Sequence, residues 1–363
     1  MNSKYTIKVV LFSPSLDAVS GVSTHANMLF GSDLARQFEL LHFQVGSEGR
    51  NEGKLRKLMR FVLSPLQLAG FLAKNQPQIV HINTSMDRKA FWRDIVYLIV
   101  ARLMGCRVVN EFHSGFGPRH LFRNSLPLWL LRRFLLASHC VAVLSNETLR
   151  LHKEFDSRIR VVLVPNAIDA VSLLDAPRQI NRDDPLRLVF VGRLVRTKGL
   201  FEMIEALALL KAERIPFCFK IAGSGADEAA LRSLIAEYGL EQEVVLLGPL
   251  FGEAKNKLWL DSDVLVFPSH FEGLPYSILE AMAAGCVPVA TAVGGIPDVM
   301  RDGEHGLFVA LRDPVSVAGA IRRLAQDREE LQRISQAGRS RIADQYTADR
   351  LAERFGQIYQ SIL

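Results

Sequence analysis

The sequence lacks paired cysteines, long apolar runs and a leader pattern. Its four cysteines (Cys106, Cys140, Cys218 and Cys286) lie far apart and form no Cys-x-x-Cys pair. This spacing disfavours a zinc site and favours buried thiols in a reducing compartment. The longest nearly uncharged apolar stretch, residues 61–73, is too short to cross a bilayer, and the first residues do not resemble a signal peptide. We therefore expect a cytoplasmic protein.

Size and composition favour two ordinary globular domains. The chain has 363 residues, 49% of them hydrophobic and 23% charged, which is enough apolar material for two cores. Residues 1–180 contain 23 basic and 13 acidic side chains, whereas the remainder contains 21 and 25. This asymmetry predicts that an anionic partner meets the first half. Nucleic acid is not the expected partner, because no recognition motif accompanies the charge.

Short apolar runs rich in β-branched residues alternate with helical patterns along both halves, which predicts parallel sheets covered by helices on each side. A proline-rich and charged stretch, 177–185, resembles an interdomain linker. We predict an N-terminal doubly wound domain at 1–178 and a second at 179–345. A C-terminal helix at 346–363 is expected to pack back on the first domain. Ligands of such domains bind beyond the carboxyl ends of the strands, so two facing domains predict a deep cleft.

The most informative segment is Phe267–Gly285, where a strand, a loop with glycine and proline, and a helix follow one another. Glu272 lies in the loop and Glu280 lies eight positions later on the helix. The amides that open the helix form an anion site for a diphosphate, with the two carboxylates free to accept hydrogen bonds from sugar hydroxyls. The alternative is that Glu272 only caps the helix and Glu280 lies on the surface.

Three further loops follow predicted strands of the second half. Arg193 and Lys198 lie between the first strand and the helix expected at 200–210, where two cations could clamp a diphosphate. Gly223 begins a Gly-Ser-Gly turn, which is weak evidence alone because it does not extend to a dinucleotide fingerprint. Thr291–Asp298 contains another glycine turn. Four loops at one edge of a sheet favour a nucleotide-diphosphate site.

Together these segments resemble glycosyltransferase family 4, whose members are retaining enzymes with the GT-B fold and a Glu-x7-Glu motif. The resemblance covers residues 165–310, where the strings Gly-Arg-Leu…Lys-Gly, Gly-Ser-Gly, Phe-Glu-Gly-Leu-Pro…Glu-Ala-Met-Ala-Ala-Gly and Gly-Gly-Ile-Pro-Asp occur in order. Two positions depart from the usual pattern: Ala167 replaces a glycine and Asp298 replaces a glutamate. The resemblance implies a hexosyltransferase built from two Rossmann-like domains.

The resemblance also implies roles for individual residues. Arg193 and Lys198 are expected to bind the donor diphosphate, Glu272 to contact the transferred sugar, and Glu280 to contact the ribose of the nucleotide. The backbone amides of Gly273 and Leu274 in this loop are expected to support the sugar or the phosphate. Because cationic side chains and helix amides replace a metal in this family, we expect no metal and no other cofactor.

The first half resembles the family less closely, as expected of an acceptor-binding domain. Gly21 follows the first strand, and its amide is expected to approach the donor phosphate or the acceptor; the alternative is a simple strand-helix turn. His113 ends a later strand and is expected to face the donor sugar. His25, His42 and His81 are interpreted as structural.

Two basic and apolar stretches suggest how the acceptor is presented. In 52–63, Leu55, Leu58, Met59 and Val62 share one helical face, and 119–134 mixes aromatic with basic residues. Both patterns suit a helix on an anionic membrane surface, although a core-packed helix with a solvated basic face explains them equally.

We therefore expect a glycan or lipid-linked acceptor in bacterial surface polysaccharide or lipopolysaccharide assembly, with the protein peripheral on the inner face of the cytoplasmic membrane. The alternatives are another GT-B enzyme, such as a nucleotide-sugar epimerase, and a non-catalytic partner subunit.

Overall fold

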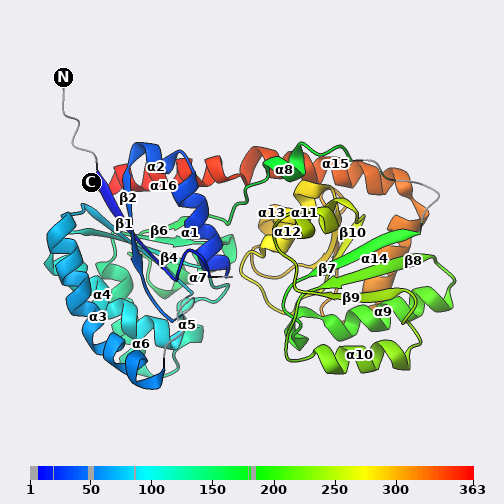
Figure 1. Ribbon diagram of the computed structural model, residues 1–363, viewed down its shortest axis with the longest axis horizontal. Coiled ribbons are helices and arrows are strands. Elements are labelled where there is room, and N and C mark those ends of the chain that lie inside the picture. Colours follow the sequence, from blue (N-terminus) through cyan, green and yellow to red (C-terminus); the bar gives the residue numbers. More distant parts are fainter. Residues whose placement is uncertain (1–6, 19, 48–52, 86, 179, 181–184) are drawn as a thin grey trace. The chain divides into compact units, whose positions relative to one another are not determined.

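The computed structural model describes all residues except 1–6, 19, 48–52, 86, 179 and 181–184, and it describes only the backbone of 54–58. The chain divides into two compact units (Figure 1). Unit 1 comprises Met1–Ala167 and Ala348–Leu363, and unit 2 comprises Ile168–Thr347. Each unit contains a six-stranded parallel sheet, as the alternation of apolar runs and helical patterns predicts.

The sheet of unit 1 has the spatial order β2-β1-β3-β4-β5-β6. The four central strands are buried on both faces, which explains why the sequence shows apolar runs there rather than alternation. The strands are β1 (Lys8–Ser13), β2 (Glu39–Gln44), β3 (Ile79–Thr84), β4 (Arg107–Phe112), β5 (Cys140–Val143) and β6 (Val161–Leu163).

Helices cover both faces of this sheet. One face packs against α3, α4 and α6, and the other packs against α1, α2 and α16. The helices of the unit are α1 (Gly21–Gly31), α2 (Leu34–Gln37), α3 (Lys54–Asn75), α4 (Arg88–Leu103), α5 (Pro118–Leu121), α6 (Ser125–Ala137), α7 (Asn146–Phe155) and α16 (Ala348–Ile362).

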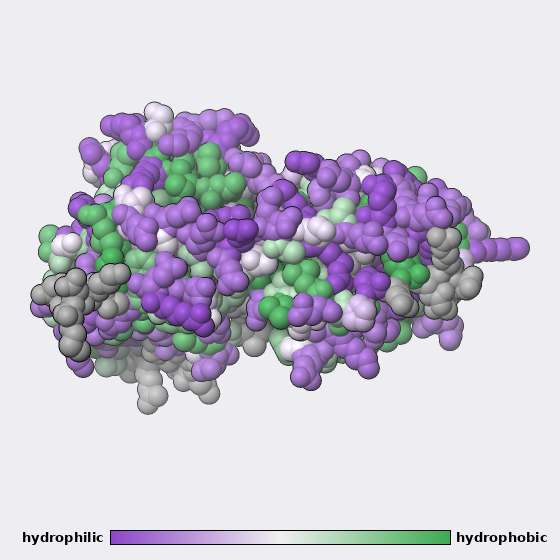
Figure 2. Space-filling view, turned by 90° about the horizontal axis from the view of Figure 1, so that it is seen from above, coloured by the Kyte–Doolittle hydropathy of each residue, from purple (hydrophilic) through white to green (hydrophobic). Residues whose placement is uncertain are grey.

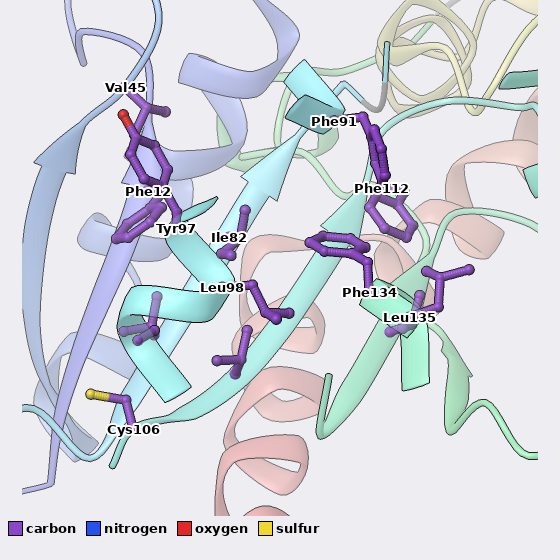
Figure 3. Close-up of a cluster of buried hydrophobic side chains, with 14 of the residues drawn as sticks. Phe12, Val45, Ile82, Phe91, Tyr97, Leu98, Cys106, Phe112, Phe134 and Leu135 are labelled. Carbon is purple, nitrogen blue, oxygen red and sulfur yellow. The ribbon is translucent and has the colours of Figure 1, made fainter. Parts of the chain in front are cut away.

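Aromatic side chains form the centre of the first of these cores (Figure 3). The Phe91 ring of α4 lies 5.8 Å from the Phe134 ring of α6, and the Phe12 ring of β1 meets the Tyr97 ring of α4 edge-on at 5.6 Å. Such edge contacts are favourable beyond the burial of area alone. This core attaches α4, and therefore the loop before it, to the middle of the sheet.

The second core of unit 1 is completed by the last helix of the chain. Phe355 and Tyr359 of α16 are fully buried with Leu29 of α1 and Leu34 of α2. The apolar face expected for this helix is therefore the face that packs, and the helix packs within unit 1.

The division between the units differs from the predicted limit at 178. Residues after Ala167 belong to unit 2, because α8 (Val171–Leu174) packs on α11 and α12 of that unit. The Arg339 guanidinium also donates to the Ala176 carbonyl at 2.9 Å. The proline and charge pattern at 177–185 does not mark this limit. The chain leaves unit 1 and returns to it at neighbouring points, because Ile168 and Thr347 form a β-bridge.

The sheet of unit 2 has the order β12-β11-β10-β7-β8-β9. Its two central strands are β7 (Leu186–Val191) and β10 (Val264–Phe267), which pair directly. The remaining strands are β8 (Phe217–Ala222), β9 (Val244–Gly248), β11 (Val287–Thr291) and β12 (Leu307–Val309).

The helices of unit 2 leave the two central strands toward different sides of the sheet (Figure 1). After β7 come the 3₁₀ turn η1 (Arg196–Lys198) and α9, which packs with α10 and α14; α12 follows β10 and packs with α8, α11 and α15. The strand order therefore reverses between β7 and β10, where such sheets bind ligands. The helices are α9 (Leu200–Ala212), α10 (Glu228–Glu237), α11 (Gly252–Leu260), α12 (Tyr276–Ala284), α13 (Ile296–Val299), α14 (Pro314–Gln326) and α15 (Arg328–Gln345).

The surface is largely hydrophilic in the view of Figure 2, with hydrophobic patches between polar side chains. In the part of the chain that the structure describes, no helix combines the length and the apolar character that crossing a bilayer requires.

Phe355 gives a direct test of the role of α16 in unit 1. Replacing this fully buried ring with alanine leaves a cavity between α16 and the sheet, so Phe355→Ala should lower the free energy of unfolding by about 3 kcal/mol or more. Gln360→Ala, on the exposed side of the same helix, is the control. Urea unfolding measures both, and equal stability of the two variants would show that α16 does not complete the core.

Candidate functional site

The loop after β10 holds the first of the two predicted glutamates. Glu272 is 7% exposed, and its Oε1 accepts a hydrogen bond from Ser269 Oγ at 2.6 Å. Ser269 is held in turn, because its carbonyl accepts from Thr291 Oγ1. The carboxylate is therefore oriented by its own loop and by the end of β11.

Lys198 lies on the neighbouring loop and forms an ion pair with Glu272. Both side chains, taken without their backbone, are mostly buried (14% exposed for Lys198 and 9% for Glu272), so water screens the pair weakly. The Lys198 ammonium also lies 5.3 Å from the centre of the Phe267 ring, a favourable position for a cation. A lysine and a carboxylate are thus brought together at the point where the strand order reverses.

Backbone contacts fix the two loops to each other. The His270 amide donates to the Thr197 carbonyl at 2.8 Å, and Ser277 Oγ donates to the Val191 carbonyl at 2.7 Å. Gly199 has a φ of +73°, and a Cβ there would lie 2.2 Å from the Pro268 carbonyl oxygen. The close approach explains why the Lys-Gly pair of the sequence needs its glycine.

The second glutamate does not lie freely on the surface. Glu280 of α12 is only partly exposed and accepts from Lys255 Nζ at 2.7 Å and from Trp259 Nε1 at 3.1 Å. Lys255 and Trp259 are four residues apart on α11, and therefore face the same side of that helix. The surface interpretation of Glu280 is wrong, because two neighbouring side chains hold its carboxylate.

The helix-capping interpretation of Glu272 is also wrong. The N-cap of α12 is Pro275, and no side chain caps this end of the helix. Glu272 instead pairs with Lys198. Gly273 and Leu274 connect Glu272 to the helix, and the Gly273 carbonyl accepts from the Gly295 amide at 2.6 Å.

The remaining loops of unit 2 lie at the same edge of the sheet. Gly223 follows β8, and a Cβ there would lie 1.8 Å from the Gly192 carbonyl oxygen, so the loops after β7 and β8 touch through backbone. Arg193 is exposed in the loop that also carries Lys198. Arg193, Lys198, Gly223, Glu272 and the loop after β11 thus lie at one edge.

An Asp-x-Asp string in the sequence belongs to the opposite edge. Asp261 and Asp263 precede β10, whereas Glu272 follows it. Both oxygens of Asp263 accept hydrogen bonds from Arg187, and Arg178 also donates to it. This carboxylate pairs with arginines and lies away from the cation and glutamate loops.

The residues predicted in unit 1 lie at the carboxyl end of its sheet. Gly21 is the first residue of α1, whose N-cap Ser20 accepts from the Ser23 amide. His113 directly follows β4, and its Nε2 lies 2.5 Å from Asn83 Oδ1. Burial lowers the pKa of His113 to about 4, so the imidazole is neutral at pH 7.

Glu111, two residues before His113, is a fully buried carboxylate surrounded by imidazoles. Its Oε2 lies 3.0 Å from His25 Nε2 and 3.1 Å from His81 Nε2, and its Oε1 lies 3.6 Å from His113 Nε2. Burial raises the pKa of Glu111, but these neighbours hold it well below its ordinary value. His81 Nδ1 lies 2.7 Å from the Tyr359 hydroxyl. His25 and His81 are therefore core residues, as expected.

Metal-ligand spacing occurs at this buried cluster. Among the described residues, His25, Glu111 and His113 offer ligand atoms within 4.8 Å of one another. The cluster lies in unit 1, whereas the predicted diphosphate cations lie in unit 2.

Sequence reasoning missed the partners that orient the predicted residues. Ser269 precedes Glu272 by three positions, and Asn83 contacts His113 from a different strand. A polar residue directly after a buried run marks a strand end, which is the signal that could have found Ser269 and Asn83. Lys255 and Trp259 carry no comparable signal, because a lysine and an aromatic four residues apart are common on ordinary helices.

Gly294 tests how tightly the Glu272 loop is held. Its φ is +58°, and a Cβ would lie 2.1 Å from the Glu272 carbonyl oxygen. Gly294→Ala should displace that loop and increase hydrogen exchange of the amides at 270–274. Gly303→Ala is the matched control, because Gly303 has a φ of +69° but open space around the Cβ. In both variants, backbone strain should lower the free energy of unfolding by about 1–2 kcal/mol. Unchanged hydrogen exchange in Gly294→Ala would contradict the tight contact.

Comparisons with known proteins agree with this arrangement. A model described as Glycosyltransferase Family 4 matches residues 21–171, and one described as Glycosyl transferases group 1 matches residues 175–341. AmsK of Erwinia amylovora, an amylovoran biosynthesis glycosyltransferase, is 29% identical over 249 residues, which cover 66% of this chain and 57% of AmsK. The matched segments span about half the length of the curated relatives.

Solved structures show the same fold over nearly the whole chain. Sucrose-phosphate synthase of Thermosynechococcus elongatus has a TM-score of 0.78 at 20% identity, covering 98% of this chain and 99% of that chain. HepE of Anabaena, in complex with UDP-glucose, has a TM-score of 0.75 at 16% identity, covering 98% and 100%. With both family models matched and this fold shared, the chain belongs to glycosyltransferase family 4 and has the GT-B fold.

Proposed function

We propose that the chain is a retaining glycosyltransferase that moves a hexose-type sugar from a nucleotide-diphosphate sugar to a glycan or lipid-linked acceptor in bacterial surface polysaccharide or lipopolysaccharide assembly. The names of AmsK and of the HepE complex with UDP-glucose support this assignment. The observation that carries it is the Lys198–Glu272 pair at the reversal point of the second sheet.

The Lys198–Glu272 pair occupies the position at which the donor binds. Without a ligand, the mostly buried lysine and carboxylate pair with each other, so neither side chain is left without a partner of opposite charge. When the donor binds, Lys198 and Arg193 contact the diphosphate, and Glu272 accepts hydrogen bonds from hydroxyls of the sugar. The amides of Gly273 and Leu274 support the same groups from the loop before α12.

The reaction exchanges one bond at the anomeric carbon for another on the same face. The bond from this carbon to the phosphate oxygen breaks, and a bond to the acceptor oxygen forms. The proton of the acceptor hydroxyl passes to the departing phosphate oxygen, so no covalent enzyme intermediate is needed. Lys198 and Arg193 stabilise the charge that develops on the leaving diphosphate, and this is why we expect no metal or other cofactor.

Glu280 and the unit 1 residues complete the donor contacts. Lys255 and Trp259 orient the Glu280 carboxylate, which accepts from the ribose hydroxyls of the nucleotide. Gly223 allows a close backbone approach at the same edge. From unit 1, Gly21 supports the phosphate and the neutral imidazole of His113 faces the transferred sugar.

Substitution of the paired residues tests the catalytic assignment. Lys198→Ala removes a cation that contacts the leaving group, and Glu272→Gln weakens the hydrogen bonds to the sugar. Each should lower kcat/KM by about 100-fold, with the folded state retained by circular dichroism. Lys211→Ala and Glu243→Gln, which disrupt a surface ion pair of unit 2, are the controls. Near-normal turnover in both paired variants, or product formation from donor without acceptor, would overturn the proposal.

A membrane surface is the proposed location of the acceptor. Trp92, Val96, Ile99 and Leu103 form a stripe along α4 and are between 37% and 82% exposed. Met59, Val62, Leu63 and Leu66 form a second exposed stripe along α3, which contacts α4. The α3 segment contains five basic residues and no acidic residue, so its charge suits anionic lipid headgroups.

These stripes refine the helical face expected from the sequence. Met59 and Val62 are exposed as that expectation requires, whereas the side chains of Leu55 and Leu58 lie outside the described residues. The second stretch, 119–134, contributes Phe122, Leu131 and Phe134 to the core of unit 1, whereas most of its other residues are exposed. Leu126 and Trp129 are the large apolar side chains exposed on α6.

Liposome co-sedimentation tests the membrane surface. Leu66→Gln combined with Leu103→Gln removes the most exposed members of the two stripes, at 70% and 82% exposure. This double variant should reduce binding to anionic vesicles several-fold. Val171→Gln combined with Val315→Gln makes the same change at exposed valines of unit 2. Equal binding by both double variants, or no preference for anionic over neutral vesicles, would contradict the proposal.

A further inference from the structure

A pocket opens at the reversal point of the first sheet. In the order β2-β1-β3-β4-β5-β6, the helix after β1 packs on one face and the helix after β3 packs on the other. The chain therefore leaves these two neighbouring strands toward opposite faces of the sheet, as it does after β7 and β10. A cavity of about 570 Å³ lies there, and its lining includes Pro14 after β1, Gly46 after β2 and Ser85 after β3. This volume is within the range of small-molecule sites.

The lining of this pocket has an excess of positive charge. Among the residues that the structure describes, Arg60, Lys89 and Arg93 line it together with one acid, Asp87. The carboxylate of Asp87 caps α4, because Oδ1 accepts from the Lys89 and Ala90 amides at 2.7 and 2.8 Å. These amides are neutral and leave its charge in place, so the described lining combines three positive charges with one negative charge and favours an anion.

A buried carboxylate outside the pocket holds one of these cations, Arg93, in place. Arg93 Nε donates to Asp94 Oδ1 at 2.7 Å, and Asp94 is 2% exposed and does not line the pocket. The other end of the guanidinium reaches the pocket wall, since Nη1 lies 3.4 Å from the position of a Cβ at Gly46. A guanidinium fixed in this way is suited to a planar carboxylate or to phosphate oxygens.

The pocket also reaches the expected reaction centre within unit 1. Asn83 lines it, and Asn83 Oδ1 is the atom that lies 2.5 Å from His113 Nε2. Two exposed aromatic side chains, Phe61 and Trp92, also line the pocket. Aromatic faces cover the apolar faces of sugar rings, while the cations bind an acidic substituent.

We propose that this pocket binds the acceptor and that the acceptor sugar carries an anionic group, a carboxylate or a phosphate ester. The identification of the ligand as the acceptor rests on the proposed function. The binding of an anionic group in this pocket does not depend on that function. Lys89, Arg60 and Arg93 contact the anionic group, Trp92 and Phe61 contact the ring, and the hydroxyl to be glycosylated lies toward Asn83 and His113.

Fluorine NMR of the full chain tests the pocket without catalysis. The chain has three tryptophans, and 5-fluorotryptophan labelling reports on Trp92 in the pocket, Trp129 on α6 and Trp259 beside Glu280. With UDP present in excess to occupy unit 2, the probes are methyl glucuronide, glucose 6-phosphate and neutral methyl glucoside. We expect both anionic probes to shift the Trp92 signal alone and the neutral probe to bind at least about tenfold more weakly.

Charge removal gives the second arm of the experiment. Lys89→Gln should weaken binding of the anionic probes about tenfold, and Arg60→Gln should act in the same direction. Lys74→Gln, at the exposed end of α3, is the control and should bind like the unmodified chain. Whether the carboxylate or the phosphate probe binds more tightly identifies the source of the anionic group.

The two proposals fail in different ways. Equal binding of neutral and anionic probes, a shift of Trp259 instead of Trp92, or unchanged binding by Lys89→Gln would overturn the anionic pocket. None of these outcomes depends on turnover. Failure of the proposed function is instead seen as normal turnover of the Lys198 and Glu272 variants, which leaves Trp92 binding unaffected.

Discussion

The arrangement of unit 2 depends on one ion pair between the loops of its two central strands. Lys198 and Glu272 belong to segments 74 residues apart in sequence, and they meet because β7 and β10 are neighbours whose helices leave toward different sides of the sheet. Backbone contacts through Gly199, Gly223 and Gly294 hold the surrounding loops too close for any side chain at these positions. The pair therefore has a fixed location. In the proposed function, a donor replaces each partner with a group of its own.

Unit 1 also contains a buried carboxylate, but imidazoles surround it instead of a lysine. Its buried carboxylate, Glu111, is surrounded by imidazoles from α1, β3 and the end of β4, and it connects the helix that begins at Gly21 with His113. Three cations of unit 1, Arg60, Lys89 and Arg93, lie outside this cluster and line the pocket at the reversal point of the sheet. They are a small part of the positive charge that the sequence shows in its first half.

The sequence allowed much of this to be predicted, for identifiable reasons. Buried parallel strands produce continuous apolar runs, so both sheets and the loops after their strands could be placed, and Lys198 and Glu272 could be assigned to the same edge. The partners of Glu280 could not be predicted, because Lys255 and Trp259 resemble residues of any surface helix. The limit near residue 178 was misplaced since a proline and charge cluster looks like a linker, while α8 has only four residues and gives almost no periodic signal.

A crystal structure of the chain with bound UDP-glucose, the ligand in the HepE complex, is the sharpest test of the proposed donor site. We expect Lys198 Nζ to leave Glu272 and contact an oxygen of the diphosphate, with the Glu272 carboxylate within hydrogen-bond distance of a hydroxyl of the sugar. A bound nucleotide sugar beside an intact Lys198–Glu272 pair, or one bound at the amino ends of the strands near Asp263, would contradict it.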